Sequence, residues 1–306
     1  MSLDVSEPVL IGVDWGTSSL RAFLIGANGE VLDKVASSEG IMNVPGRDFE
    51  AVFGRLIGAW SADRTLPVLA SGMITSRNGW VETPYATVPL GAGELARALV
   101  PYKTSCGIDL RFITGVTTDH ASGPDVMRGE ETQIIGASAF GMSDGTFVMP
   151  GTHSKWIRVA GNQIEDYATY MTGEIFAVLK GHTILGTLIE EGPFSPEGFT
   201  QGVEAGLADG SALLHDLFHV RTLPLLGRMK AVDVEDYLSG LLIGTEIRAA
   251  QERGDATDMI TVIGRSDLTD RYEDALAVAG IDSRRAPDDI VAMGHFLIAR
   301  SAGLVS

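Results

Sequence analysis

The stretch VDWGTSSLRAFL, residues 13–24, joins two apolar runs through a polar turn that contains glycine. Before it, PVLIGVD (8–14) is a continuous apolar run that ends at a turn, as is typical of a buried strand. After it, LRAFLIG (20–26) and VLDKVASSE (31–39) are separated by Asn28-Gly29, a tight hairpin signal. The sequence therefore predicts a meander of three strands with a glycine turn after the first.

The meander is repeated 135 residues further along the chain, without a gap. The second copy consists of the strand GTFVM (145–149), the turn PGTHS (150–154), the strand KWIRVA (155–160) and the strand IEDYATYMTGE (164–174). Six identities fall on this offset, among them Gly16-Thr17 on Gly151-Thr152 and Glu39 on Glu174. Because this period far exceeds that of solenoid repeats, we expect a duplicated domain.

Helical spacing of apolar residues follows each meander. In the first half it occurs at 48–60, with Asp48 as a candidate N-cap, and at 92–102 and 130–141; buried strands are expected at 67–72 and 110–116. In the second half it occurs at 173–190, 195–208, 233–254 and 268–280, with a strand at 259–264. The pattern predicts an α/β fold of two domains, residues 1–143 and 144–306.

Composition and charge exclude several classes of protein. The 306 residues are 45% hydrophobic and 21% charged, which is typical of a globular protein, and no apolar run is long enough to cross a bilayer. A net charge of −17 argues against nucleic acid or an anionic membrane as a partner. The N-terminus does not resemble a signal peptide, so we expect a cytoplasmic protein. The single cysteine, Cys106, excludes a disulfide framework and is expected to be a small core residue.

The two glycine turns have the chemistry of a phosphate site. Glycine lets a ligand approach the backbone, and hydroxyl and N–H groups donate to phosphate oxygens. Asp14, at the end of the first strand, can hold a divalent metal through oxygen. Two such domains facing each other across a cleft could bind a triphosphate from both sides and transfer its phosphoryl group.

The motif VDWGTSSLRAFL resembles the first phosphate motif of the sugar kinase, heat-shock protein 70 and actin superfamily, whose Asp-x-Gly-Thr turn binds metal and phosphates. Arg21 is similar to an arginine of carbohydrate kinases such as glycerol kinase. The chain most resembles the 2-dehydro-3-deoxygalactonokinase family. That resemblance rests on GVDWGTSSLRAFL (12–24), SGMITSRNGWVETPY (71–85), DVMRGEETQIIGA (125–137), PGTHSKWI (150–157) and YMTGEIF (170–176).

The resemblance implies two duplicated ribonuclease H-like (actin-like ATPase) domains with a cleft between them. It also implies an enzyme that uses ATP and Mg²⁺ to phosphorylate the 6-hydroxyl of 2-dehydro-3-deoxy-D-galactonate. In this reading Asp14 holds the metal and Arg21 lies in the catalytic centre. The residues implied for ATP are Gly16, Thr17, Ser18, Gly151, Thr152, His153 and Lys155; those implied for the sugar acid are Met73, Arg77, Asn78, Trp80 and Glu174.

The second turn departs from the superfamily pattern, because Met149 stands where an acid is usual. We expect His153 and Lys155 to supply cationic contacts instead, with Lys155 on a phosphate or on the substrate carboxylate.

The segment SGMITSRNGWVETPYATVPLG (71–91), called the substrate loop below, is long and rich in turn formers. Arg77 could bind a substrate carboxylate through its guanidinium fork, with Asn78 and Trp80 beside the sugar. The alternative is a surface loop whose Trp80 and Tyr85 pack on the domain.

Three acids are candidates for the base that takes the proton of the sugar hydroxyl. Glu130 and Glu131 begin a predicted helix, where acids are often only complements of the helix dipole. Asp14 is a rival base, and Asp119 is a weaker candidate.

For adenosine, the resemblance points to Gly264, Arg265 and Ser266, between a strand and a helix. The alternative is an ordinary turn capped by Asp267 or Thr269. Gly240 and Gly244 could admit the adenine ring or permit close helix packing.

Other functions are weighed against the sugar kinase. His215 and His219 have metal-ligand spacing, but the glutamate of a zinc protease motif is missing, which favours a helix surface. An ATP-hydrolysing chaperone-like protein and an exopolyphosphatase-like enzyme of the same superfamily are the alternatives. A homodimer is left open.

Overall fold

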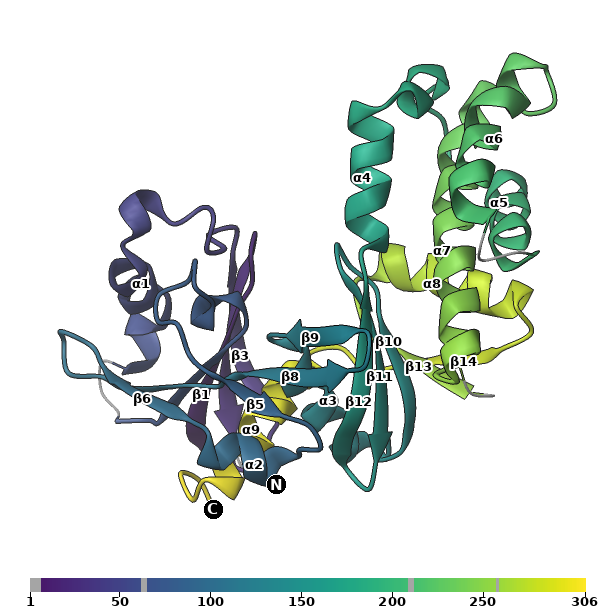
Figure 1. Cartoon of the computed structure of the whole chain (residues 1–306). Helices are drawn as coiled ribbons and strands as arrows, with labels where there is room; N and C mark the ends of the chain where they lie inside the picture. Colours follow the sequence, from purple (N-terminus) through teal and green to yellow (C-terminus); the bar gives the residue numbers. More distant parts are fainter. Residues whose placement is uncertain (1–6, 62–64, 209–211, 257–258) are drawn as a thin grey trace, which may run out of the picture. The chain divides into compact units, whose positions relative to one another are not determined.

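The computed structural model describes residues 7–61, 65–208, 212–256 and 259–306. The chain packs as two compact units, drawn in Figure 1. Unit 1 contains the residues up to Asp144 together with 159–166 and 287–306, and unit 2 contains 145–158 and 167–286. This division differs from the expected boundary between residues 143 and 144, because the last twenty residues pack with unit 1.

Unit 1 is built on a six-stranded sheet in the order β3-β2-β1-β4-β7-β6. The predicted meander forms its first half, since β1 pairs antiparallel with β2 and β2 with β3, whereas β4 and β7 continue it in parallel. The strands are β1 (Pro8–Trp15), β2 (Leu20–Gly26), β3 (Val31–Ser37), β4 (Val68–Ser71), β6 (Val100–Lys103) and β7 (Asp109–Phe112).

Helices and a small sheet complete unit 1. The helix α1 (Phe49–Ser61) buries Phe49, Val52, Phe53 and Ile57 in the core, and its first turn is capped as predicted, with Ala51 N donating to Asp48 Oδ1 at 3.0 Å. The other helices are α2 (Ala92–Arg97), α3 (Glu130–Ala137) and α9 (Ile290–Ser301), and the small sheet has the order β5-β8-β9, with β5 (Tyr85–Thr87), β8 (Gly115–His120) and β9 (Gly123–Met127).

Unit 2 has the same arrangement in a five-stranded sheet of the order β12-β11-β10-β13-β14, although residues 159–166, at the end of β11 and the start of β12, group with unit 1. The strands are β10 (Gly145–Met149), β11 (Ser154–Ala160), β12 (Gln163–Tyr170), β13 (Met259–Val262) and β14 (Asp282–Arg285), and β13 is parallel to both of its neighbours. The helices are α4 (Thr172–His182), α5 (Pro196–Ala208), α6 (Leu213–Leu225), α7 (Val234–Arg253) and α8 (Ser266–Val278). The predicted duplication of the meander is therefore present in the fold.

The helices α5 and α7 lie side by side in Figure 1, and glycines allow their backbones to touch. A Cβ on Gly202 of α5 would overlap the carbonyl oxygen of Tyr237, and one on Gly240 of α7 would overlap that of Phe199. A Cβ on Gly244 would overlap the carbonyl oxygen of Val203 in the same way. Of the two roles weighed for Gly240 and Gly244, the structure supports close helix packing.

Several sequence expectations are corrected. The helix expected at 92–102 ends at Arg97, because Pro101 cannot extend a helix, and residues 100–103 form β6 instead. The strand expected at 110–116 is divided between β7 and β8, which belong to different sheets. Cys106 is exposed rather than part of the core, with its sulfur 3.1 Å from Thr104 Oγ1.

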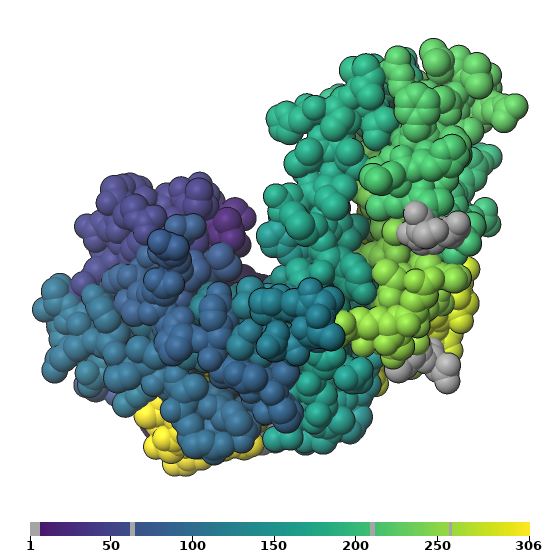
Figure 2. All heavy atoms as spheres, viewed as in Figure 1, coloured from purple at the N-terminus to yellow at the C-terminus, as the bar shows by residue number. Residues whose placement is uncertain are grey.

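Exposed apolar side chains gather on α6, in the green part of Figure 2, where Leu214, Phe218 and Leu225 are 88%, 57% and 61% exposed. No helix within the described ranges combines the length and the apolar character that a bilayer span requires.

Candidate active site

The first glycine turn of unit 1 connects β1 to β2 and is closed by the chain that leaves β3. Gly16 N donates to Ser19 O at 2.9 Å, while Ile41 N and Met42 N donate to Gly16 O and Thr17 O at 3.0 and 3.1 Å. A Cβ on Gly40 would overlap the backbone of Ser18, so only glycine permits this approach. Thr17 and Ser18 are exposed, which leaves their hydroxyls accessible to a ligand.

Asp14 and Arg21 are opposite each other on β1 and β2, and their side chains form an ion pair of 2.5 Å between Oδ2 and Nη2. Asp14 is 15% exposed and Arg21 37%. Mg²⁺ is usually held by one or two carboxylates together with waters and substrate phosphates. A single, partly exposed carboxylate beside an exposed glycine turn fits that pattern.

His295 of α9 was not found by sequence reasoning, although it packs beneath this site. Its Nε2 lies 3.0 Å from Ser71 Oγ, and Ser71 is the β4 neighbour of Asp14. Burial, together with the charge of Arg21, lowers the pKa of His295 to about 3. The imidazole is therefore neutral at physiological pH.

The second turn, in unit 2, is closed in the same way as the first. Glu174 N donates to Thr152 O at 2.9 Å, and a Cβ on Gly173 would overlap the carbonyl oxygen of Gly151. The side chains of Glu174 and His153 also meet, with 2.5 Å between Oε2 and Nε2. The two residues were expected to bind different ligands, yet in this structure they bind each other.

Lys155 lies on β11 and is buried, with its Nζ donating to His153 O at 3.2 Å. Met149 at the end of β10 is also buried. The amine is thus held against the backbone of the second turn. The expected contact of Lys155 with a phosphate or with the substrate carboxylate stays a prediction.

Glu246 of α7 is a buried acid that sequence reasoning missed. Its Oε1 accepts from Ser154 Oγ and Trp156 Nε1, both at 2.7 Å. Its Oε2 accepts from Thr172 Oγ1 and from Tyr272 OH, the latter at 2.8 Å. Burial raises the pKa of Glu246, and the hydrogen bonds from Thr172, Ser154 and Trp156 oppose that rise. Ser154 lies at the end of the second turn, and Thr172 lies two residues before Glu174. The Glu246 carboxylate therefore holds the second turn and the start of α4 in place. The sequence did contain a signal for Glu246, because it is an acid within a mostly apolar stretch of a predicted helix.

The start of the substrate loop lies beside the first turn and α3. Gly72 packs against the backbone of Trp15, and Gly129, which precedes α3, packs against Gly72. Met73 is half-buried against the core of unit 1, whereas Arg77 and Asn78 are exposed. Unit 1 thereby brings the predicted metal acid, the substrate loop and the candidate base together along one edge of its sheet.

Trp80 packs within the core of unit 1. Its ring centroid lies 5.1 Å from that of Tyr102, 5.6 Å from Phe53 and 5.8 Å from Phe112. Trp15 and Phe49 also contact it. This packing supports the alternative stated for the substrate loop, in which Trp80 packs on the domain instead of contacting the sugar.

Glu130 and Glu131 begin α3, but only Glu131 is buried. Its Oε2 accepts from Gly129 N at 2.6 Å and its Oε1 from Thr132 Oγ1 at 3.0 Å. Burial raises the pKa of Glu131 to about 8, helped by the nearby charge of Glu130. A carboxyl that titrates near neutral pH has the affinity for a proton that general base catalysis requires.

Gly264, Arg265 and Ser266 form an exposed connection between β13 and α8. Arg265 is paired with Asp267, at 3.1 Å from Nε to Oδ1 and 2.8 Å from Nη2 to Oδ2. Neither Asp267 nor Thr269 caps the helix, because the N-cap position is Arg265 and it has no side-chain cap. The alternative to an adenosine site, a turn with Asp267 or Thr269 as the N-cap, is therefore wrong about the N-cap residue.

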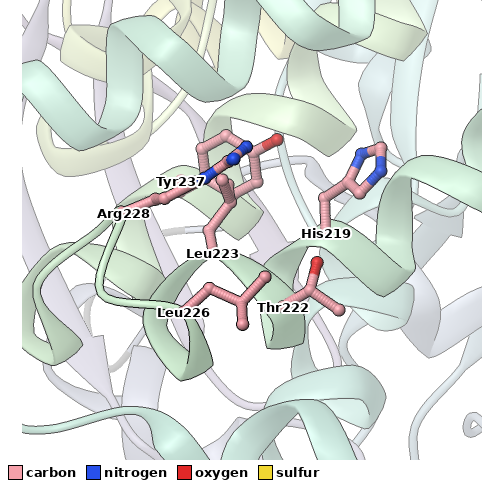
Figure 3. Close-up of a pocket in the computed structure, with 6 residues that line it drawn as sticks. All are labelled: His219, Thr222, Leu223, Leu226, Arg228 and Tyr237. Carbon is pink, nitrogen blue, oxygen red and sulfur yellow. The ribbon is translucent and has the colours of Figure 1, made fainter.

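A hollow of about 360 Å³ lies beside α6 and α7 and contains none of the predicted site residues (Figure 3). Its lining includes His219, Arg228 and Tyr237. On α6, ligand atoms of His215, Asp216 and His219 lie within 4.8 Å of one another on the partly exposed helix surface that the sequence predicts.

Two sheet-containing units, each with a meander, a glycine turn after its first strand and parallel strands beyond, define the sugar kinase and actin-like ATPase class of folds. Component A of the (R)-2-hydroxyglutaryl-CoA dehydratase of Acidaminococcus fermentans is 12% identical with a TM-score of 0.55, over 97% of this chain and 100% of that chain. A xylulose kinase of Lactobacillus acidophilus is 11% identical with a TM-score of 0.51, over 96% and 89%. At these identities the likeness shows the fold alone, and it confirms the predicted fold class.

The chain belongs to the 2-keto-3-deoxy-galactonokinase family, whose sequence profile matches residues 14–298, and it is a phosphotransferase. The 2-dehydro-3-deoxygalactonokinase of Escherichia coli (strain K12) is 36% identical over 272 residues, 89% of this chain and 90% of that protein. A solved structure described as a 2-dehydro-3-deoxygalactonokinase protein of Sinorhizobium meliloti is 35% identical, with a TM-score of 0.88 over 95% of this chain and 98% of that chain. This membership does not favour the chaperone-like and exopolyphosphatase-like alternatives.

Proposed function

We propose that this kinase transfers the γ-phosphoryl group of ATP to the 6-hydroxyl of 2-dehydro-3-deoxy-D-galactonate. The observation that carries the proposal is the family match across residues 14–298, together with 36% identity to a relative of that name. The equivalent closure of the two glycine turns supports a reaction centred on phosphate. ATP is a cytoplasmic metabolite, so the cytoplasm is the proposed location.

In this proposal the two turns bind the phosphates. The phosphate contacts come from Gly16, Thr17 and Ser18 in the first turn and from Gly151 and Thr152 in the second, where Thr17, Ser18 and Thr152 are exposed. His153 adds a further contact, and Lys155 adds positive charge. Asp14 would hold Mg²⁺, which would supply charge neutralisation for the phosphates. Gly264, Arg265 and Ser266 hold the adenosine, beside the first turn of α8.

Arg21 has a specific part in this scheme. Its ion pair with Asp14 neutralises the carboxylate. If Asp14 held Mg²⁺, the guanidinium of Arg21 would be free to pair with a phosphate oxygen, for which its fork geometry is suited.

The sugar acid lies on the substrate loop, where exposed Arg77 and Asn78 and half-buried Met73 offer contacts. Glu174 contributes from the second turn. Glu131 is the preferred base over Glu130, Asp14 and Asp119, because a carboxylate whose pKa is raised to about 8 binds the proton of the attacking hydroxyl more strongly than an ordinary glutamate does.

The proposal is tested by measuring ADP release with ATP, Mg²⁺ and a panel of sugar acids, glycerol and hexoses. We expect release only with the 2-dehydro-3-deoxy sugar acids, and a loss of kcat of about 100-fold or more in Asp14→Ala, which removes the metal ligand. The galactonate and gluconate epimers are compared directly. ADP release at the same rate without any sugar, or only with glycerol or hexoses, would overturn the proposal.

A further inference from the structure

Arg128, at the end of β9, is a buried arginine that lies against the substrate loop. Its side chain is enclosed so that the residue is only 9% exposed. Nη1 donates to Thr75 Oγ1 at 2.6 Å and to Thr83 Oγ1 at 2.7 Å, and Nη2 donates to Thr83 O at 3.3 Å. The guanidinium also lies 4.3 Å from the ring centroid of Tyr85. Thr75, Thr83 and Tyr85 all belong to the substrate loop.

Every group that accepts a hydrogen bond from this guanidinium is neutral. Within the described ranges no carboxylate lies within ion-pair distance of it, and its Nε is buried without a hydrogen-bond partner. Arginine cannot lose its proton in a protein, so the charge persists. A buried charge without a counter-charge is unfavourable, and such a group in a native structure needs an explanation.

The hydrogen bonds of the Arg128 guanidinium indicate which kind of group would fit its unpaired edge. The two threonine hydroxyls occupy Nη1 and fix the plane of the guanidinium, whereas the edge formed by Nε and Nη2 carries only the long bond to Thr83 O. Two parallel N–H groups on one edge match the two oxygens of a carboxylate. Because Nε is buried, a carboxylate reaches this edge only when the substrate loop moves.

Arg128 is also close in the chain to the candidate base. Its backbone N donates to Glu130 Oε2 at 2.9 Å, and the next residue, Gly129, donates to Glu131 Oε2 at 2.6 Å. The guanidinium and the base are therefore held by one short connection between β9 and α3. A substrate with a carboxylate at one end and a reacting hydroxyl at the other could contact both.

We propose that Arg128 binds the carboxylate of the sugar-acid substrate and selects acids over neutral sugars. This inference rests on the proposed function and deepens it, since it identifies the group that recognises the acid. It differs from the sequence prediction for Arg77, which is exposed and so binds a carboxylate in competition with water.

The test compares kcat/KM for the 2-dehydro-3-deoxy sugar acid and for its uncharged carboxamide in wild type, Arg128→Met and Arg128→Lys. Arg77→Met tests the rival assignment, in which Arg77 binds the substrate carboxylate. We expect wild type to prefer the acid strongly. In Arg128→Met the acid should lose about 100-fold and the amide less than about threefold, so that the preference collapses, while Arg77→Met keeps it.

Arg128→Lys keeps the charge but loses the fork, and it should lose about tenfold on the acid with little change on the amide. This variant decides the question if Arg128→Met does not fold, as judged by its thermal unfolding. Equal losses on acid and amide in the Arg128 variants, or a collapse of the preference in Arg77→Met alone, would overturn the inference. A wild type that phosphorylates no sugar acid would instead refute the proposed function.

Discussion

At the scale of single residues, two buried glutamates, Glu246 and Glu131, differ in the hydrogen bonds and the charges that surround their carboxyl groups. Glu246 receives hydrogen bonds from four side chains, which oppose part of the rise in its pKa that burial causes. Glu131 receives one from a backbone N–H and one from a hydroxyl, and lies near the charge of Glu130. The first arrangement suits a structural anchor, and the second suits a group that exchanges a proton.

The raised pKa of Glu131 predicts how stability changes with pH. An unfolded glutamate titrates near 4.5, whereas folding raises the pKa of this carboxyl to about 8. Between those values the folded protein retains a proton that the unfolded chain has released, so the free energy of unfolding falls as pH rises. The contribution is at most about 1.4 kcal/mol per pH unit.

Urea unfolding of wild type and Glu131→Gln at pH 5, 6, 7 and 8 measures this contribution. The difference in unfolding free energy between the two proteins should shift steadily in favour of the variant as pH rises. Glu130→Gln should reduce the pH dependence of the wild type in part, because the charge of Glu130 helps to raise the pKa of Glu131. The same pH dependence in wild type and Glu131→Gln would contradict the assignment.

At the scale of elements, the contact between α5 and α7 depends on the absence of side chains. A methyl group on Gly202 would overlap the carbonyl oxygen of Tyr237, which can be relieved only by moving one helix. Gly58 in α1 offers a control, because nothing lies within 4 Å of the position that its Cβ would take.

Gly202→Ala is therefore expected to destabilise the protein by about 1–3 kcal/mol, through overpacking. Gly58→Ala should be neutral or stabilise by up to about 1 kcal/mol, because alanine favours a helix over glycine. Thermal unfolding followed by circular dichroism compares the two variants. If both variants unfold at the wild-type temperature, the contact between α5 and α7 is looser than described.

Elements with a clear local period were predictable, and the others were not. The two meanders, α1, α5, α7 and β13 follow from apolar periodicity and turn residues. In contrast, α9 is buried on several sides at Ile290, Gly294, His295 and Ile298, so it lacks the polar face that marks a helix in sequence. The strand β14 is short and mostly exposed, with the sequence DSRR. Such an edge strand carries almost no apolar signal.

The residues of the candidate site were likewise predictable only where the sequence carries a local pattern. The glycine turns could be predicted because the duplication makes them visible in the sequence. Arg128, Glu246 and His295 could not be assigned, because the partners of their side chains are 26 or more residues away in the chain. Trp80 was expected beside the sugar, but the aromatic residues that surround it come from four separate elements.

At the scale of the whole molecule, unit 1 is discontinuous in sequence. Its sheet is formed by the first 112 residues, but α9 packs on β1 from residues 290–301. Gly12 of β1 has room for no side chain, because a Cβ there would lie 2.6 Å from His295 Nδ1. The residues between, which form most of unit 2, pack around cores of their own.

Removal of α9 should therefore weaken unit 1 rather than unit 2. In a chain that ends at Ala286, we expect amide hydrogens of β1 and β4 to exchange about 100-fold faster or more, while those of β10 and β13 keep their protection. Hydrogen exchange with mass spectrometry resolves these strands. The milder variant His295→Ala should change exchange in β1 and β4 in the same direction. Loss of protection confined to β10 and β13 would be the contrary result.

The position of α9 also sets an order of events during synthesis of the protein. About 275 residues separate the end of β1 from α9. At roughly 5–20 residues per second, a ribosome needs on the order of 15 to 55 seconds to make them. During that interval the face of β1 that receives α9 has no partner, whereas unit 2 can fold as soon as β14 emerges. The domain that begins first is thus completed last.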